Sequence, residues 1–128
     1  RICSYQLFII NMKVIVNDNM FRVKVCMTPE TIQKGMMNQK FNSDFNGMLF
    51  MLPECGEQSF WMKNCITPLD IVFMDESQTI TDISHNCHPC DTNDCEHYNG
   101  YGQYVLELEG GTCESCGIEK GQKAKFTL

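Results

Sequence analysis

Polar side chains that could do chemistry interrupt the most apolar stretch of the chain, "SFWMKNCITPLDIVFMD". Lys63 and Asn64 follow Trp61, and Asp70 opens the next apolar run. Pro68 cannot continue a strand, so the segment after Lys63 is predicted to be a loop. A few polar groups beside an aromatic wall are typical of a small-ligand pocket. In the alternative interpretation, Asn64 and Asp70 hydrogen-bond the loop's own backbone and Lys63 points to solvent.

The cysteines form a second candidate site. The chain has nine of them, and two CxxC pairs join Cys87 with Cys90 and Cys113 with Cys116. A CxxC pair puts two thiolates on one turn, and two such turns complete a tetrahedral zinc site. The spacing therefore predicts a structural Zn²⁺ at these four cysteines. The alternative ligands nearby are Cys95, His85 and His97.

Two other interpretations of the cysteines stay open. The thiols could form disulfides or remain free without any metal, and chains with this much cysteine are usually secreted disulfide proteins or metal binders. Cys113 could also be redox-active, because a helix N-terminus at this position would lower the pKa of its thiol.

Composition and charge exclude several classes of partner. The chain has 128 residues, 43% of them apolar and 20% charged, which is typical of a folded domain rather than a disordered one. Ten basic residues face sixteen acidic ones, giving a net charge of -6. Nucleic acid is therefore not the expected partner, and neither is an anionic membrane. No apolar run approaches the roughly 20 residues of a membrane span, so no transmembrane segment is expected. An unidentified small molecule or a protein remains the expected partner.

The first eleven residues are predicted to be a disordered or non-native leader, and residues 12–128 a single globular domain. The start, "RICSYQLFIINMKV", has a short apolar patch without a small-residue cleavage site. We therefore expect a cytoplasmic protein, with an exported or periplasmic protein as the alternative.

Short strands dominate the pattern. A hairpin is predicted over residues 12–27, with "NDN" as its turn, and a short helix follows, capped by Thr28. Residues 86–102 are predicted to have no regular secondary structure. The segment "CESC" is predicted to form one helical turn that ends at Gly117. Further strands are predicted at "MLFML", "QSFWM", "LDIVFMD", "TITDISH", "QYVLELE" and "KAKFTL". The predicted fold class is mainly β (α+β), a compact β-barrel or sandwich of about seven to eight short strands with one or two short helices.

A series of motifs gives the chain a family resemblance. In order along the chain stand "GMM", "GMLF", "FWMKN", "PLDIVFMD", "PC" with Cys95 and Tyr98 beyond it, "YVLEL" and "GIEKGQ". Their order and spacing over roughly residues 20–128 resemble the bacterial, archaeal and phage family called Domain of Unknown Function 192. The resemblance implies a small, mostly β fold and no established activity.

The resemblance also singles out particular positions. Cys65 stands where the family more often has Thr. Cys90 and Cys95 match a family pair that a short-range disulfide would explain, as an alternative to zinc. Cys87, Cys113 and Cys116 depart from the family pattern. The polar positions that match the family are Lys63, Asn64, Asp70 and Glu107.

These observations favour a non-enzymatic binding or accessory module with a polar pocket beside Trp61, stabilised by zinc through the CxxC pairs. The alternative is a metal-dependent hydrolase that uses Asp70 with Asp75 or Glu107, because carboxylates bind Mg²⁺ or act as general bases. The sequence has no nucleophile elbow and no HExxH motif to support the hydrolase. The predicted ligand-binding residues are Trp61, Lys63, Asn64, Asp70 and Glu107.

Overall fold

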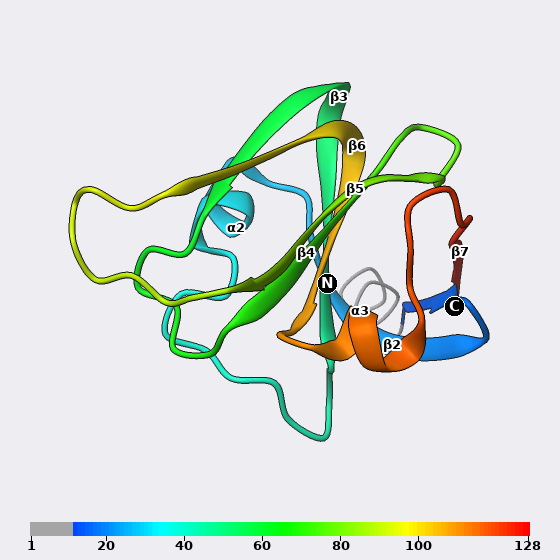
Figure 1. Ribbon diagram of the computed structural model, residues 1–128, viewed down its shortest axis with the longest axis horizontal. Coiled ribbons are helices and arrows are strands. Elements are labelled where there is room, and N and C mark those ends of the chain that lie inside the picture. Colours follow the sequence, from blue (N-terminus) through cyan, green and yellow to red (C-terminus); the bar gives the residue numbers. More distant parts are fainter. Residues whose placement is uncertain (1–11) are drawn as a thin grey trace, which may run out of the picture.

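Seven strands form one strongly curved sheet in the computed structural model, which describes residues 12–128 (Figure 1). Their order across the sheet is β5-β4-β6-β3-β2-β1-β7. The elements are β1 (Lys13–Val16), β2 (Asn19–Cys26), α2 (Pro29–Lys34), β3 (Gly47–Trp61), β4 (Leu69–Met74), β5 (Ile80–Cys87), β6 (His97–Glu109), α3 (Thr112–Cys116) and β7 (Lys125–Thr127). The predicted mainly β class with two short helices is confirmed. The leader predicted at residues 1–11 lies outside the described residues.

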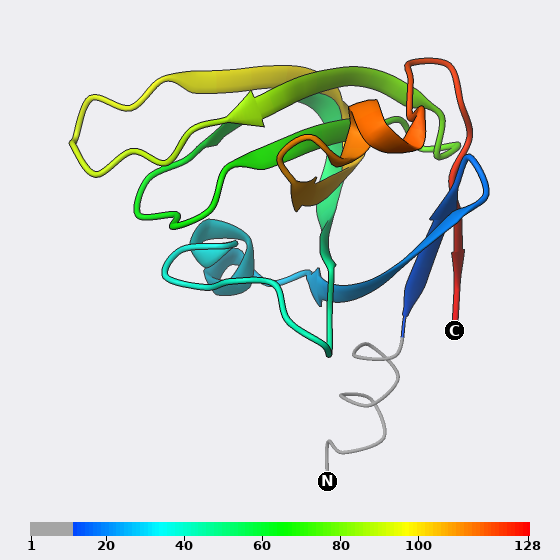
Figure 2. The same cartoon turned by 60° about the horizontal axis from the view of Figure 1, so that its bottom comes forward.

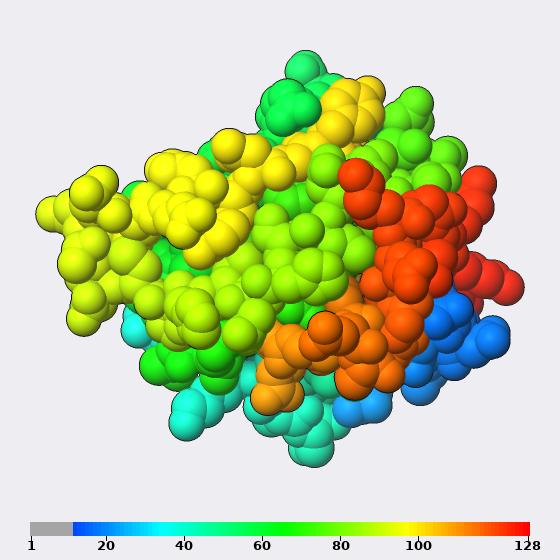
Figure 3. All heavy atoms as spheres, in the orientation of Figure 1, coloured from blue at the N-terminus to red at the C-terminus, as the bar shows by residue number. Residues whose placement is uncertain are grey.

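The sheet curls into a half-barrel, so the predicted compact β-barrel is only half formed (Figure 2). The start of β5 and the segment before β7 nevertheless meet. The Ile80 amide donates to the Gln122 carbonyl at 2.8 Å, and the Gly121 amide donates to the Ile80 carbonyl at 2.9 Å. In Figure 3 the orange and red atoms of the C-terminal part adjoin green atoms of the β4–β5 region at the surface.

Local sequence signals explain the first elements. Asn17 and Asp18 have φ of 48° and 63°, which asparagine and aspartate tolerate, and they form the tight turn of the β1–β2 hairpin. The Thr28 hydroxyl accepts the Thr31 amide at 3.2 Å, so it caps α2 as predicted. Gly35 ends this helix with a φ of 46°.

Two strand predictions are corrected by tertiary pairing. The segments on either side of Pro53 form one long β3, with an irregularity between Met51 and Gly56 that accommodates the proline. The predicted irregular stretch over residues 86–102 is shorter, because β6 already begins at His97 and pairs with Trp61. Glycine is needed in this part of β6, since a Cβ at Gly100 would overlap the Phe73 ring.

Both faces of the central strands are buried. In the pairing of β4 with β6, Ile71 lies opposite Glu107 and Val72 lies opposite Leu106, so adjacent positions project to opposite faces. We call the side that packs against Ile32 of helix α2 the α2 face; its core includes Phe50, Met62, Leu69, Ile71 and Phe73. The α3 face carries Cys113 of helix α3; its core includes Leu49, Val72, Met74, Leu106 and Leu108. Coverage on both sides explains why every residue of "LDIVFM" is buried.

Candidate ligand-binding site

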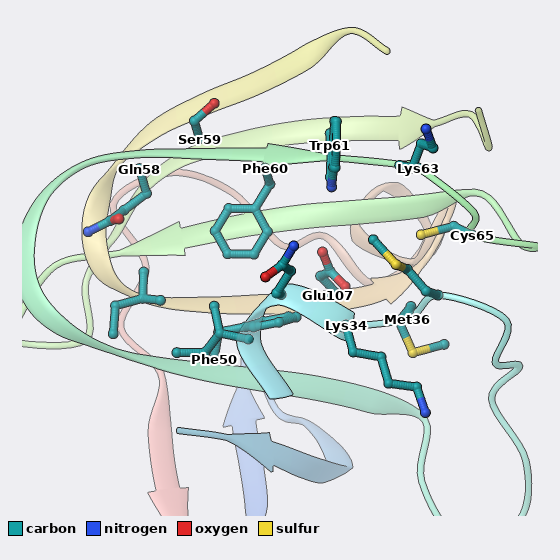
Figure 4. A pocket seen from close by; sticks show the side chains of 15 residues that line it. Lys34, Met36, Phe50, Gln58, Ser59, Phe60, Trp61, Lys63, Cys65 and Glu107 are labelled. Atoms are coloured by element: carbon teal, nitrogen blue, oxygen red, sulfur yellow. The ribbon is translucent and has the colours of Figure 1, made fainter. Parts of the chain in front are cut away.

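A cavity of about 250 Å³ lies on the α2 face, between α2 and strands β3 and β6 (Figure 4). Its walls are largely apolar and include Phe50, Phe60 and Met36, while Glu107 of β6 lies in its interior. The volume is slightly below the roughly 300 Å³ at which drug-sized ligand sites begin. The cavity therefore suits a small organic molecule.

Glu107 is the unusual group in this cavity. Its side chain is only 3% exposed. Within residues 12–128, its carboxyl group forms neither an ion pair nor a hydrogen bond with another side chain or backbone group. Burial raises the pKa of Glu107 to about 8, because the charged form loses its hydration. A buried polar group without a protein partner needs an explanation, and its position in a cavity provides one.

Trp61 and Lys63, two of the predicted ligand-binding residues, line the same cavity. Lys63 is held at the rim, where its Nζ donates to Asn93 Oδ1 at 2.5 Å and lies 5.8 Å from the centre of the Trp61 ring. The His97 ring lies 5.8 Å from the Trp61 ring and is hydrogen-bonded to Ser59 Oγ at 3.0 Å. Figure 4 shows the indole nitrogen directed to the side of the cavity where Glu107 lies. Lys63 and His97 therefore hold the Trp61 ring in place at the rim, and the indole N–H points into the cavity.

Asn64 does not line the cavity. It is a backbone corner with a φ of 59°, and its amide donates to the Cys90 carbonyl at 2.8 Å. Its own carbonyl accepts the Asn38 amide at 2.9 Å. These bonds join the loop after β3 to two other loops. Asn64 therefore has a structural role in the backbone, as in the alternative interpretation of the sequence.

Asp70 lies on the α3 face, opposite to the cavity. Its neighbour Ile71 pairs with Glu107, so the side chains of Asp70 and Glu107 project from opposite faces of the sheet. The Asp70 carboxylate is completely buried. Its Oδ1 accepts the amides of Asn86 at 2.7 Å and Gly111 at 3.2 Å, and its Oδ2 accepts the Cys113 amide at 2.8 Å. The expectation that Asp70 lies beside Trp61 is therefore wrong, and the carboxylate instead ties β4 to the end of β5 and the start of α3.

Asp75, the other carboxylate of the hydrolase alternative, is part of a turn. Its Oδ1 accepts the Ser77 hydroxyl at 2.8 Å and the backbone amides of Ser77 at 2.9 Å and Thr79 at 3.0 Å. The hydrogen bond from the Ser77 side chain is the main reason why the pKa of Asp75 is lowered. Asp70, Asp75 and Glu107 therefore do not converge on one site.

The predicted four-cysteine zinc site is not assembled. Cys90 forms a disulfide with Cys95, as the family resemblance implied, so its sulfur is not a thiolate ligand. Cys87 is buried in the core of the α2 face and Cys113 in that of the α3 face. Among residues 12–128, no three or more His, Cys, Asp or Glu side chains are grouped so that they could hold a metal ion.

The remaining cysteine and histidine predictions are also corrected. Burial raises the pKa of Cys113 and brings that of Cys87 to about 12, which is the opposite of the lowered value expected of a redox thiol at Cys113. His85 is exposed on β5, Cys116 is half-buried in α3, and His97 lies at the rim of the cavity.

Sequence reasoning missed the wall that α2 contributes. The cavity is also lined by Ile32, Lys34, Met36 and Met37, which belong to the helix and the segment after it. "GMM" stood out as a motif, but only the packing of α2 against β3 brings it opposite Glu107. In the part of the chain that the structure covers, no helix has both the length and the apolar character needed to cross a bilayer.

Similar solved structures include the following two. One is a protein of unknown function from Novosphingobium aromaticivorans DSM 12444, with 30% identity, a TM-score of 0.78, and coverage of 88% of this chain and 83% of that one. The other, from Sinorhizobium meliloti 1021, is described as a proposed transcription regulator, with 27% identity, a TM-score of 0.77, and coverage of 90% of this chain and 91% of that one. No curated protein matches the chain significantly.

The family resemblance noted in the motifs is confirmed over almost the entire chain. The model of the DUF192 family, described as "Uncharacterized ACR", matches residues 12–126. The match includes the strands and helices that form the cavity around Glu107. The chain therefore belongs to the DUF192 family.

Proposed function

We propose that the protein is a non-enzymatic binding module whose cavity beneath Trp61 takes a small organic molecule. The observation that carries the proposal is the carboxyl group of Glu107, which is 3% exposed, has no partner within residues 12–128 and lines a cavity of about 250 Å³. Apolar walls with a few convergent polar groups are the usual composition of a ligand site.

The surroundings of the cavity support binding rather than turnover. Chemistry on a bound molecule needs a nucleophile or an acid–base pair within reach. The cavity contains one carboxyl group, and burial raises the pKa of the Cys65 thiol beside it to about 12. A thiol with so high a pKa is a weak nucleophile near neutral pH.

The hydrolase alternative has less support. It requires Asp70 to act with a second carboxylate, but Asp70 is already bonded to three backbone amides on the face away from Glu107. A buried carboxylate held by three backbone amides has a structural role that explains its presence.

The proposal is tested with a library of small fragments that contains amines, acids, alcohols and amides. We expect a subset to raise the thermal midpoint of the wild type and to change the fluorescence of Trp61, the only tryptophan in the chain. Cys65→Phe adds a ring to the cavity wall and should abolish these effects. Ile66→Phe is the matched control, because Ile66 is 50% exposed and lies outside the cavity.

The proposal fails if no fragment of any class affects the wild type. It also fails if the fragment effects persist unchanged in the Cys65→Phe variant, because binding would then occur elsewhere.

A further inference from the structure

We propose that the cavity selects an organic cation, a protonated amine on an apolar body, whose ammonium group contacts the Glu107 carboxylate. This inference rests on the proposed binding function and adds the chemical class of the ligand. It goes beyond the family assignment, which carries no ligand.

Within residues 12–128, Glu107 has no ion-pair partner. A buried carboxylate is costly unless it is paired and hydrogen-bonded. No lysine, arginine or histidine of residues 12–128 supplies that pair. An ammonium group brings both a positive charge and N–H donors, and such charge-assisted hydrogen bonds are about twice as strong as neutral ones. Of the common ligand head groups, an amine therefore gains most from this position.

Aromatic rings line the same cavity as the carboxyl group. Phe50, Phe60 and Trp61 all line the cavity, and the Phe50 and Phe60 rings pack edge to face with centres 5.0 Å apart. The electron-rich faces of aromatic rings attract cations, and the rings also cover an apolar ligand body. A carboxylate combined with aromatic rings thus suits an ammonium group with a hydrocarbon or aryl substituent.

Two lysines, Lys34 and Lys63, line the cavity and would favour an anionic ligand if their amino groups faced its interior. Lys63 is bonded to Asn93 at the rim. Figure 4 shows the amino groups of both Lys34 and Lys63 turned away from Glu107. The chain as a whole carries a net charge of -6, and such a field attracts cations and repels anions. The overall charge therefore favours an amine, and the two lysine amino groups point away from the carboxyl group that its ammonium would contact.

Few other groups near Glu107 titrate in the relevant range. Burial raises the pKa of Cys26 on β2, Cys65 after β3 and Cys87 on β5 to about 12, so these thiols stay neutral at moderate pH. Lys34 and Lys63 carry the other charges at the cavity. His97 lies beside Trp61 at the rim, with the two ring centres 5.8 Å apart. As a titratable group at the rim, it must be controlled in a pH experiment.

The experiment measures the affinity of three molecules of similar shape by calorimetry at pH 8.5: phenethylamine, 2-phenylethanol and phenylacetate. We expect the amine to bind most tightly. Glu107→Gln keeps the shape of the side chain but removes its charge, and should weaken amine binding by about tenfold or more. The same substitution should leave 2-phenylethanol almost unaffected. Glu109→Gln is the matched control, because Glu109 is exposed two positions along the same strand.

A second readout is the pH dependence of amine binding to the wild type. Because the pKa of Glu107 is about 8, the ammonium must bind against a protonated carboxyl group below that pH. Affinity should therefore rise by up to about tenfold per pH unit from pH 6 towards pH 8 and then level off. The rise should persist in His97→Gln and disappear in Glu107→Gln.

The outcomes separate this inference from the proposed function. If the alcohol or the acid binds as tightly as the amine and Glu107→Gln has no effect, the cation inference is overturned while the binding function stands. The inference is also overturned if no amine of a wider series (benzylamine, butylamine, cyclohexylmethylamine) binds while other fragments do. If no fragment of any class binds, both proposals fail.

Discussion

Asp70 and Glu107 lie on neighbouring paired strands and are almost equally buried, at 0% and 3% exposure, yet their surroundings differ completely. Asp70 accepts three backbone amides on the α3 face, whereas Glu107 has no protein partner within residues 12–128 on the α2 face. Burial alone therefore does not identify a functional carboxylate. The count of hydrogen-bond partners distinguishes a structural acceptor from a candidate binding group.

The largest effect is expected from Asp70→Ala. The substitution leaves three buried or partly buried amides without their acceptor, so the free energy of unfolding should fall by about 3 to 5 kcal/mol. Urea denaturation followed by circular dichroism measures the change. Asp91→Asn is the control, because Asp91 is exposed and should tolerate the substitution. If Asp70→Ala lowers the free energy of unfolding no more than Asp91→Asn does, Asp70 does not have the structural role proposed for it.

Glu107→Gln should remove a loss of stability that the wild type undergoes as the pH rises. The pKa of Glu107 in the folded protein is about 8, above its ordinary value of 4.5. Between these values the folded state binds more protons at Glu107 than the unfolded state, so the contribution of Glu107 to stability is greatest below pH 4.5 and is lost as the pH rises to about 8. The loss should be on the order of a few kcal/mol and absent in Glu107→Gln. Equal pH slopes in urea titrations of both proteins would show that Glu107 does not titrate abnormally.

Removal of the Cys90–Cys95 disulfide tests whether the loop that it closes stabilises the segment after β3 at the rim of the cavity. The Cys90 amide donates to the Met62 carbonyl at 3.1 Å, and the Cys90 carbonyl accepts the Asn64 amide at 2.8 Å. Cys90→Ser combined with Cys95→Ser should cost about 2 kcal/mol, because the bridge closes only a short loop. Thermal unfolding measures the loss, and Trp61 fluorescence should shift. Cys116→Ser is the control. An unchanged thermal midpoint would show that the bridge adds no stability.

The smallest effect is expected from Lys63→Ala. The hydrogen bond of Lys63 to Asn93 is solvent-exposed, so its loss should change the free energy of unfolding by less than about 0.5 kcal/mol. Trp61 fluorescence should still respond, because the Lys63 amino group lies 5.8 Å from the ring centre. A large destabilisation would mean that Lys63 supports the sheet and not only the rim.

Local signals predicted much of the fold. The hairpin turn at Asn17 and Asp18, the cap at Thr28 and the single turn closed by Gly117 each depend on neighbouring residues, and all three are confirmed. The start of β6 at His97 was missed because its strand character comes from pairing with β3, far away in the sequence. Strand preference depends on such partners more than helix preference does.

The candidate site was only half predictable for the same reason. Trp61, Lys63 and Glu107 line the cavity, while Asn64 and Asp70 do not. Alternation along a strand states which residues share a face, but only the pairing of Ile71 with Glu107 decides that Asp70 faces away from Glu107. The CxxC spacing likewise predicted zinc, but the bond from Cys90 to Cys95 and the separate burial of Cys87 and Cys113 disperse the four thiols.

By itself, the sequence determined a mainly β chain, its turns and caps, its family and the polar residues from which any site must be drawn. These properties follow from residue types, short spacings and local backbone preferences. Only the tertiary structure decided that Asp70 binds backbone amides while Glu107 faces a cavity without a protein partner. The reason is physical: whether a buried carboxyl group is satisfied depends on donors from distant strands and loops, and their positions are fixed only by the register and curvature of the whole sheet.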